Sequence, residues 1–125
     1  MIAAIDPSLN KAWRSIERLA GVGASAGVWR SSLQWGDRVT IVTLNSVYTL
    51  ITMDDDRFMI SGGWFDRHRA SPAVVNVAGC TCGGAAINRK LIAAPGLHLE
   101  LGNRVVTTEI RQVTLERFQR SREIH

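Results

Sequence analysis

A chain of 125 residues with a net charge of +4, 46% hydrophobic residues and 21% charged residues is typical of one soluble globular domain. At this length a chain buries about two-thirds of its unfolded surface, so folding requires neither a metal nor a disulfide, and two cysteines exclude a disulfide scaffold. The N-terminus lacks the pattern of a signal peptide, and the longest uncharged stretch, residues 70–88, is too polar and too often broken by Gly and Pro to span a bilayer. We therefore expect a cytoplasmic protein.

Residues 1–22 predict an amphipathic N-terminal helix. Asp6 can cap this helix and Pro7 suits its first turn. Apolar residues recur at helical spacing, with charged residues largely on the other side; they are Leu9, Trp13, Ile16 and Ala20. The glycine-rich residues 21–27 then separate the helix from the rest of the chain. We take Leu9, Trp13 and Ile16 as candidate contacts with a neighbouring subunit.

Short runs rich in Val, Ile and Thr alternate with turn-forming residues from Asp37 to Leu115, which is typical of antiparallel strands. We expect strands over residues 38–44, 47–53, 57–61, 74–78, 97–101 and 106–115, and a further strand within 28–35. Between them we expect a loop over 64–72 and an irregular stretch over 79–84. Residues 85–93 could form either a strand or a short helix. About seven strands with short connections predict a mainly β fold. The expected architecture is a small antiparallel barrel or sandwich over residues 28–118, built as a local meander in a single domain.

The clearest local pattern lies at the last pair of expected strands. Leucines alternate with polar residues over 97–101, and Gly102-Asn103 predicts a two-residue hairpin turn of the Gly-first type. Even-numbered positions carry the apolar face from Val106 to Ile110, whereas odd-numbered positions carry it afterwards. This change of phase predicts a β-bulge near residues 111–112.

Residues 62–69 form the segment most typical of a binding site. Its side chains are two aromatics, an acid, an imidazole and two guanidiniums: Trp64, Phe65, Asp66, Arg67, His68 and Arg69. Loops on a rigid β scaffold often carry binding residues, and Asp66 could orient His68 as a general base requires. The alternative is structural: the two aromatics plug the end of the barrel, and Asp66 pairs with Arg67 or Arg69 at the surface.

Three other motifs give weaker indications of chemistry. Residues 23–27 match G-x-S-x-G, but a nucleophile elbow needs a strand before its serine and a helix after it, whereas a predicted helix precedes Ser25. Cys80 and Cys82 lack the spacing and the further ligands of a zinc site, and in an extended chain they share one face as small buried residues. Residues 54–56 offer too few ligands for calcium. We expect no metal and no cofactor.

These patterns leave three functional hypotheses. The first is a non-catalytic binding or assembly module that self-associates through the N-terminal helix. The second is nucleic-acid binding by stacking on bases beside basic residues, with Trp29, Trp35, Trp64, Phe65, Arg30, Arg38, Arg67 and Arg69 as candidates. The third is a small enzyme or small-molecule binder that uses Asp66 and His68 in the mouth of a barrel. Arginine supplies most of the basic residues, which suits anionic partners, but a genome that favours arginine codons is the simpler explanation.

Overall fold

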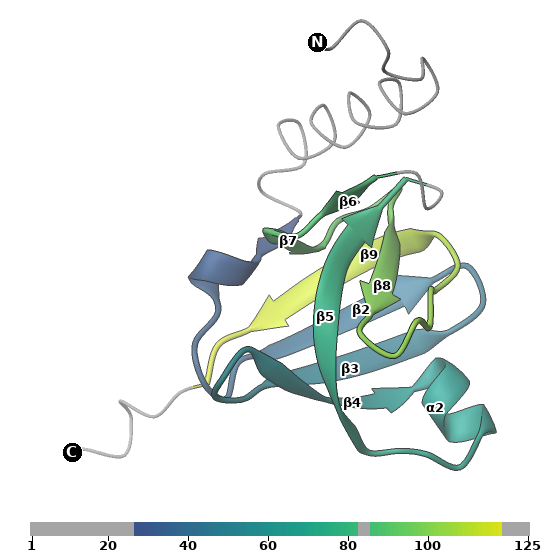
Figure 1. The fold of residues 1–125 in the computed structure, drawn as a ribbon, viewed down its shortest axis with the longest axis horizontal. Coiled ribbons are helices and arrows are strands. Elements are labelled where there is room, and N and C mark those ends of the chain that lie inside the picture. Colours follow the sequence, from purple (N-terminus) through teal and green to yellow (C-terminus); the bar gives the residue numbers. More distant parts are fainter. Residues whose placement is uncertain (1–26, 83–85, 119–125) are drawn as a thin grey trace, which may run out of the picture.

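The computed structural model describes residues 27–82 and 86–118 (Figure 1). Its elements are β1 (Val28–Trp29), η2 (Arg30–Ser32), β2 (Arg38–Thr43), β3 (Val47–Thr52), β4 (Arg57–Gly62), α2 (Gly63–Arg67), β5 (Ala73–Thr81), β6 (Ile87–Asn88), β7 (Leu91–Ala93), β8 (His98–Leu101) and β9 (Ile110–Glu116). The mainly β fold predicted from the sequence is confirmed. The helix predicted over residues 1–22, with its candidate contacts Leu9, Trp13 and Ile16, lies outside the described residues.

Seven strands form one antiparallel sheet in the order β6-β5-β4-β3-β2-β9, with β8 also paired to β5. Figure 1 shows that this sheet curls into a half-barrel, so the architecture is barrel-like. Strands β2 to β5 follow one another as the predicted meander, whereas β8 and β9 join from distant positions in the sequence. Backbone hydrogen bonds of 2.7 and 2.8 Å connect Ile110 at the start of β9 to Leu97 and Gly96, just before β8. These bonds link two strands that the sheet order places far apart.

Alternation along β2 and β3 decides which side of the sheet is the core. Val39, Ile41 and Leu50 are fully buried, while the intervening Thr40 and Thr49 lie on the outer face. The largest fully buried side chains fill the interior: Phe58, Phe65, Ile41, Leu50, Ile60, Leu91, Ile92, Leu97, Leu99, Leu101 and Ile110. Burying one such side chain contributes about 1.5–3 kcal/mol, so this packed core is the main source of the fold's stability.

Strand β5 is longer than the sequence predicted. The stretch over 79–84, expected to be irregular, instead continues the strand through Thr81. Gly79 has a φ of 144°, and the pairing register shifts between Val77 and Gly79, so the strand bends there and passes from β4 to β8. A Cβ at Gly79 would lie 2.3 Å from the carbonyl oxygen of Asn88, which explains why a glycine occupies this close approach.

The turn after β8 differs from the predicted two-residue turn at Gly102-Asn103. The N–H of Leu101 bonds to the carbonyl of Val105 at 2.9 Å, so three residues form the turn. Arg104, the last of the three, takes the left-handed conformation with a φ of 70°. A turn followed by a left-handed residue is the usual three-residue hairpin connection. An arginine does not indicate a left-handed residue, as a glycine or an asparagine would, so nothing in the sequence indicated that the predicted turn extends to Arg104.

The strand expected over residues 106–115 begins only at Ile110, and before it Val106 makes one isolated bridge with Glu100. Val106 was expected on the apolar face but is exposed, and Thr107 is buried in its place. Because residues 106–109 lie outside strands β8 and β9, the predicted alternation of faces does not hold there, whereas Ile110 is buried as expected. The predicted bulge near residues 111–112 is confirmed: Thr43 pairs with Ile110 and Val42 with Gln112, which leaves Arg111 as the additional residue.

Three other segments differ in part from their predicted structure. Residues 85–93, expected to be a strand or a short helix, contribute the short strands β6 and β7 on either side of a turn. The loop expected over 64–72 begins with helix α2, and only Val28 and Trp29 of the stretch 28–35 form a strand. The helix was missed because it starts at a sharp turn formed by Gly62 and Gly63, both with positive φ, which the sequence pattern did not indicate.

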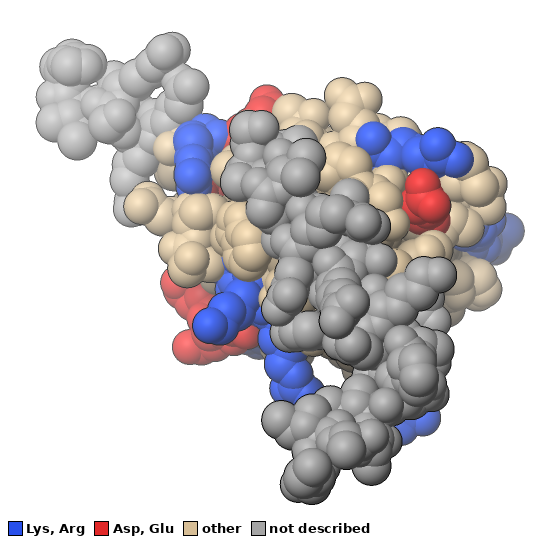
Figure 2. Space-filling model, turned by 90° about the horizontal axis from the view of Figure 1, so that it is seen from above, with Lys and Arg blue, Asp and Glu red and all other residues tan. Residues whose placement is uncertain are grey.

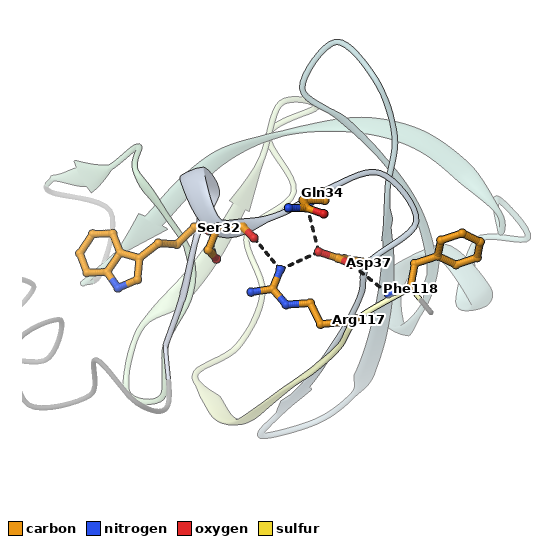
Figure 3. A network of polar contacts seen from close by, with 6 residues as sticks. Ser32, Gln34, Asp37, Arg117 and Phe118 are labelled. Carbon is orange, nitrogen blue, oxygen red and sulfur yellow. Dashed lines mark hydrogen bonds and ion pairs between the residues drawn. The ribbon is translucent and has the colours of Figure 1, made fainter. Parts of the chain in front are cut away.

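Asp37 ties the end of β9 to the loop that leads into β2 (Figure 3). Its side chain is buried, and its carboxylate accepts hydrogen bonds from the backbone N–H groups of Gln34 (2.9 Å) and Phe118 (3.0 Å) and from Nη1 of Arg117 (2.7 Å). Burial by itself would raise the pKa of Asp37, but these bonds together lower the pKa below its ordinary value of 3.8. The carboxylate therefore stays ionised inside the fold.

Candidate functional site

Helix α2 lies at one end of the half-barrel and carries four of the six candidate residues, with His68 and Arg69 just beyond its last turn (Figure 1). Gly62 and Gly63 have φ values of 95° and 45° and turn the chain sharply out of β4. A Cβ at Gly62 would lie 2.1 Å from the carbonyl oxygen of Val47, and one at Gly63 would lie 2.3 Å from the Tyr48 ring. The two glycines thus allow α2 to fold back closely against β3.

Two aromatic side chains hold α2 against the barrel. Phe65 is buried and makes edge-to-face contacts with Tyr48 and Trp64, with ring centroids 6.5 and 5.1 Å apart. The backbone N–H of Trp64 also donates to the Tyr48 hydroxyl at 3.1 Å. Phe65 is therefore a core residue that plugs the end of the barrel, whereas Trp64 is half-buried and keeps part of its ring at the surface.

The side chains of Asp66 and His68 each bind backbone atoms of other residues rather than one another. Oδ1 of Asp66 accepts a hydrogen bond from the N–H of Gly62 at 3.1 Å, and Nδ1 of His68 lies 2.8 Å from the carbonyl oxygen of Trp64. The His68 ring stacks on Trp64, with centroids 4.1 Å apart and an interplanar angle of 21°. Within the described chain, the carboxylate of Asp66 has no hydrogen bond or ion pair with His68, Arg67 or Arg69, although the backbone N–H of Arg69 donates to the Asp66 carbonyl at 3.1 Å. Neither of the two pairings considered from the sequence is therefore present.

Trp64 stands between two surface hollows. The larger one, of about 520 Å³, is lined by Trp64, Phe65, Ala70, Ala73, Val74, Val75, Asn76, Gly102 and Asn103. The smaller one, of about 90 Å³, is lined by Asn45, Ser46, Tyr48, Trp64, Arg67, Val105, Val106, Thr107 and Thr108. Of these residues only Arg67 is charged, and its Nη1 donates to Oγ of Ser46 at 2.9 Å. Val74 and Val106 add apolar exposure, at 51% and 49% of their surface.

We call the region formed by Trp64, Arg67, Val74 and Val106 the Trp64 surface. An aromatic ring beside a concave, largely uncharged lining with a few polar groups is the usual composition of a ligand or partner site. The candidate segment carries four exposed charged or titratable side chains, Arg67 within this surface and Asp66, His68 and Arg69 close to it in the sequence. Sequence reasoning found the segment but missed its neighbours, because Val74 and Val106 come from other strands.

A third hollow, of about 570 Å³, lies between the β1–η2 segment and the turn between β6 and β7. Its lining consists of Trp29, Arg30, Ser31, Arg89 and Lys90, and we call it the basic hollow. The sequence drew attention to Trp29 and Arg30 but not to Arg89 and Lys90, because only the pairing of β1 with β7 brings these two parts of the chain together.

The aromatic and basic residues considered for nucleic-acid binding occupy separate regions. Trp29 and Arg30 line the basic hollow, Trp64 and Phe65 belong to the α2 corner, and Trp35 packs edge-on against Phe118 with centroids 5.5 Å apart. Arg38 lies on the outer sheet face, 3.8 Å from Glu116. On the face drawn in Figure 2, the visible Lys and Arg side chains form separate groups, some of them next to acidic side chains.

Cys80 is a core residue. Its thiol donates to the carbonyl of Ile92 at 3.1 Å, and burial raises its pKa to about 12. Cys82 is half-buried against the same core. Because the thiolate is the reactive form, Cys80 is chemically inert in the folded protein, in agreement with the structural role expected from the sequence.

Among the described residues, no three His, Cys, Asp or Glu side chains gather in a way that could hold a metal ion. No helix within the same residues has the length and apolar character needed to cross a membrane. Comparison with protein families, with curated proteins and with solved structures finds no match.

Proposed function

We propose that this protein is a non-catalytic binding module that associates with a second copy of itself through the Trp64 surface. The supporting observation is the position of Trp64, half-buried between two hollows and fixed from both sides by Phe65 and His68. Tryptophan is among the residues that contribute most to the energy of protein interfaces. A ring that is already held in place loses little conformational entropy on binding, which favours association.

The shape of the Trp64 surface suits a second copy. A ridge beside a hollow is self-complementary under a two-fold axis, because the ridge of each copy enters the hollow of the other. The same segment of the chain carries exposed side chains of both charges: Asp66, Arg67 and Arg69. Two copies related by a two-fold axis can therefore place opposite charges against each other around the contact.

The size of the surface sets the expected affinity. It occupies one corner of a small protein, so we expect a contact at the low end of protein interfaces, with less than about 1,200 Å² buried in total. Interfaces of that size belong to transient complexes. We therefore expect a monomer–dimer equilibrium in the micromolar range, roughly −8 kcal/mol, rather than an obligate dimer.

Sedimentation velocity over a range of protein concentrations tests this proposal. Wild-type protein should show an average mass that rises reversibly with concentration, and Trp64→Ala should remain monomeric. Val106→Glu is a second variant, whose exposed position makes misfolding no explanation for a loss of association. Trp35→Ala is the matched control, since it removes an exposed tryptophan outside the Trp64 surface. A monomeric wild type, or equal association of all four proteins, would refute the proposal.

The helix predicted over residues 1–22 offers an additional contact in the same assembly, through Leu9, Trp13 and Ile16. A chain that lacks residues 1–22 but retains Trp64 separates the two contributions. An unchanged mass would count against the helix as a contact and leave the Trp64 surface as the interface.

The two alternative functions differ in their support. The hydrogen bonds do not support acid–base chemistry by Asp66 and His68, because the two side chains bind backbone atoms of Gly62 and Trp64 instead of each other. Nucleic-acid binding is the second candidate, because Trp29 and Arg30 line one hollow together. A cytoplasmic location remains a prediction from the sequence.

A further inference from the structure

The basic hollow combines an aromatic ring with adjacent cations, and this combination goes beyond self-association. We propose that it binds a phosphate group attached to a planar ring, the chemistry of a nucleotide. The site and the Trp64 surface share no residue, so either can exist without the other. This proposal is independent of the proposed self-association, and it gives nucleic-acid binding, the second candidate function, a defined location.

The walls of the basic hollow are held in place by backbone pairing. The N–H of Arg30 bonds to the carbonyl of Lys90 at 2.7 Å, next to the pairing of β1 with β7. On the opposite wall, the N–H of Lys90 donates to Oδ1 of Asn88 at 3.0 Å, which fixes the turn that carries Arg89. A ligand therefore meets a site that is already formed, and binding requires little reorganisation.

Arg30 is a structural wall rather than a free cation. Its Nε donates to the carbonyl of Arg89 at 2.8 Å, Nη2 donates to the carbonyl of Val77 at 2.7 Å, and Nη1 pairs with Oδ1 of Asp56 at 2.6 Å. Asp56 thus offsets the charge of Arg30. The guanidinium remains fixed beside the hollow and supports the position of Arg89.

Arg89 and Lys90 supply the unbalanced positive charge. Both are exposed, and within the described residues neither forms an ion pair. None of the described residues that line the hollow is acidic. A guanidinium and an ammonium in adjacent positions match a doubly charged phosphate, to which both donate charge-assisted hydrogen bonds.

Trp29 determines that the ligand carries a ring as well as a phosphate. Its side chain is half-buried and packs against the core, while the rest of its surface lines the hollow. A bare anion would leave this ring uncovered, whereas a nucleobase can stack on it, and such stacking is favourable for every base. The volume of about 570 Å³ lies in the range of small-molecule sites.

Isothermal titration of the full chain with three probes tests the proposal: adenosine monophosphate, inorganic phosphate, and an oligothymidylate of about eight nucleotides. Adenosine monophosphate should bind about tenfold or more tightly than inorganic phosphate, because only the former covers Trp29. Free nucleotide and single-stranded nucleic acid share the same chemistry, and the oligothymidylate distinguishes them. Tighter binding of the oligothymidylate with a steep salt dependence would identify nucleic acid as the source.

The double variant Arg89→Ala/Lys90→Ala should weaken the binding of both ring-bearing probes by about tenfold or more, since both unpaired cations are lost. Its matched control is Arg67→Ala/Arg69→Ala, which removes the same charge from the α2 corner and should leave the affinity within about twofold. The proposal is overturned if neither ring-bearing probe binds, if inorganic phosphate binds as tightly as adenosine monophosphate, or if the two double variants lose affinity equally.

Discussion

Asp37 and Arg117 lie 80 positions apart in the sequence, yet Oδ2 of the first and Nη1 of the second are 2.7 Å apart. The pair fastens the end of the last strand to the loop that leads into β2 (Figure 3). The two residues differ in exposure: the Asp37 side chain is 3% exposed and that of Arg117 51%. Most of the stabilisation therefore depends on the buried carboxylate and on the backbone donors around it.

Replacing Asp37 should destabilise the fold more than replacing any exposed acid. In Asp37→Ala the N–H groups of Gln34 and Phe118 lose their acceptor, and we expect the free energy of unfolding to fall by about 2–4 kcal/mol. Urea denaturation followed by circular dichroism measures this loss. Glu116→Ala is the control, because its ion pair with Arg38 is exposed and 3.8 Å long, and it should change stability by less than about 1 kcal/mol. Equal effects of the two substitutions would contradict the structure.

The same carboxylate predicts a dependence of stability on pH. The pKa of Asp37 is lower in the folded protein than its ordinary value of 3.8, so just below pH 3.8 the unfolded chain binds more protons than the folded one. The contribution of the ionised carboxylate is therefore fully present well above pH 3.8 and is lost as the pH falls through the folded pKa.

Urea denaturation of the wild type and of Asp37→Asn between about pH 2.5 and 7 measures this contribution, because asparagine does not titrate. The difference between the two free energies of unfolding should be constant near neutral pH and should shrink in the acid range. A difference that stayed constant over the whole range would show that the pKa of Asp37 is the same in both states.

The bend in β5 predicts that Gly79 tolerates no side chain. Gly79→Ala places a Cβ 2.3 Å from the carbonyl oxygen of Asn88 at a φ of 144°, and we expect a loss of about 2 kcal/mol or more in the free energy of unfolding. Gly102→Ala is the control, because its φ is not in the positive range and its nearest contact is the Asn76 Cβ at 3.2 Å, so its cost should be clearly smaller. Thermal denaturation of both variants makes the comparison, and a Gly79→Ala protein as stable as Gly102→Ala would show that β5 does not bend at this residue.

The two cysteines should differ in their reactivity toward iodoacetamide. Cys80 is buried and burial raises its pKa to about 12, so almost no thiolate forms at neutral pH and the folded protein should leave it unmodified. Cys82 is half-buried and should be alkylated first. Mass spectrometry of peptides from the native protein measures the order, and a urea-denatured sample, in which both residues should react, is the control. Modification of Cys80 ahead of Cys82 in the native protein would refute its place in the core.

The candidate site was only partly predictable. The composition of residues 64–69 singled out the segment, but its hydrogen bonds depend on the sharp turn at Gly62 and Gly63. That turn brings the Asp66 carboxylate onto the N–H of Gly62 and leaves Trp64 to stack with His68. The basic hollow was beyond sequence reasoning, because Trp29 and Lys90 are distant in the chain and become neighbours only where β1 pairs with β7.

The sequence by itself determined the local elements: strands β2, β3 and β4 with their turns, the inward and outward faces of these strands, and the bulge at Arg111. Each follows from a period of two or from a turn residue within a few positions, and such signals are local. Only the tertiary structure decided that β9 pairs with β2, that β5 bends at Gly79, and that the connection after β8 takes three residues. The physical reason is that these features are stabilised by packing and hydrogen bonds between distant segments, and no local pattern in the chain records which segments will meet.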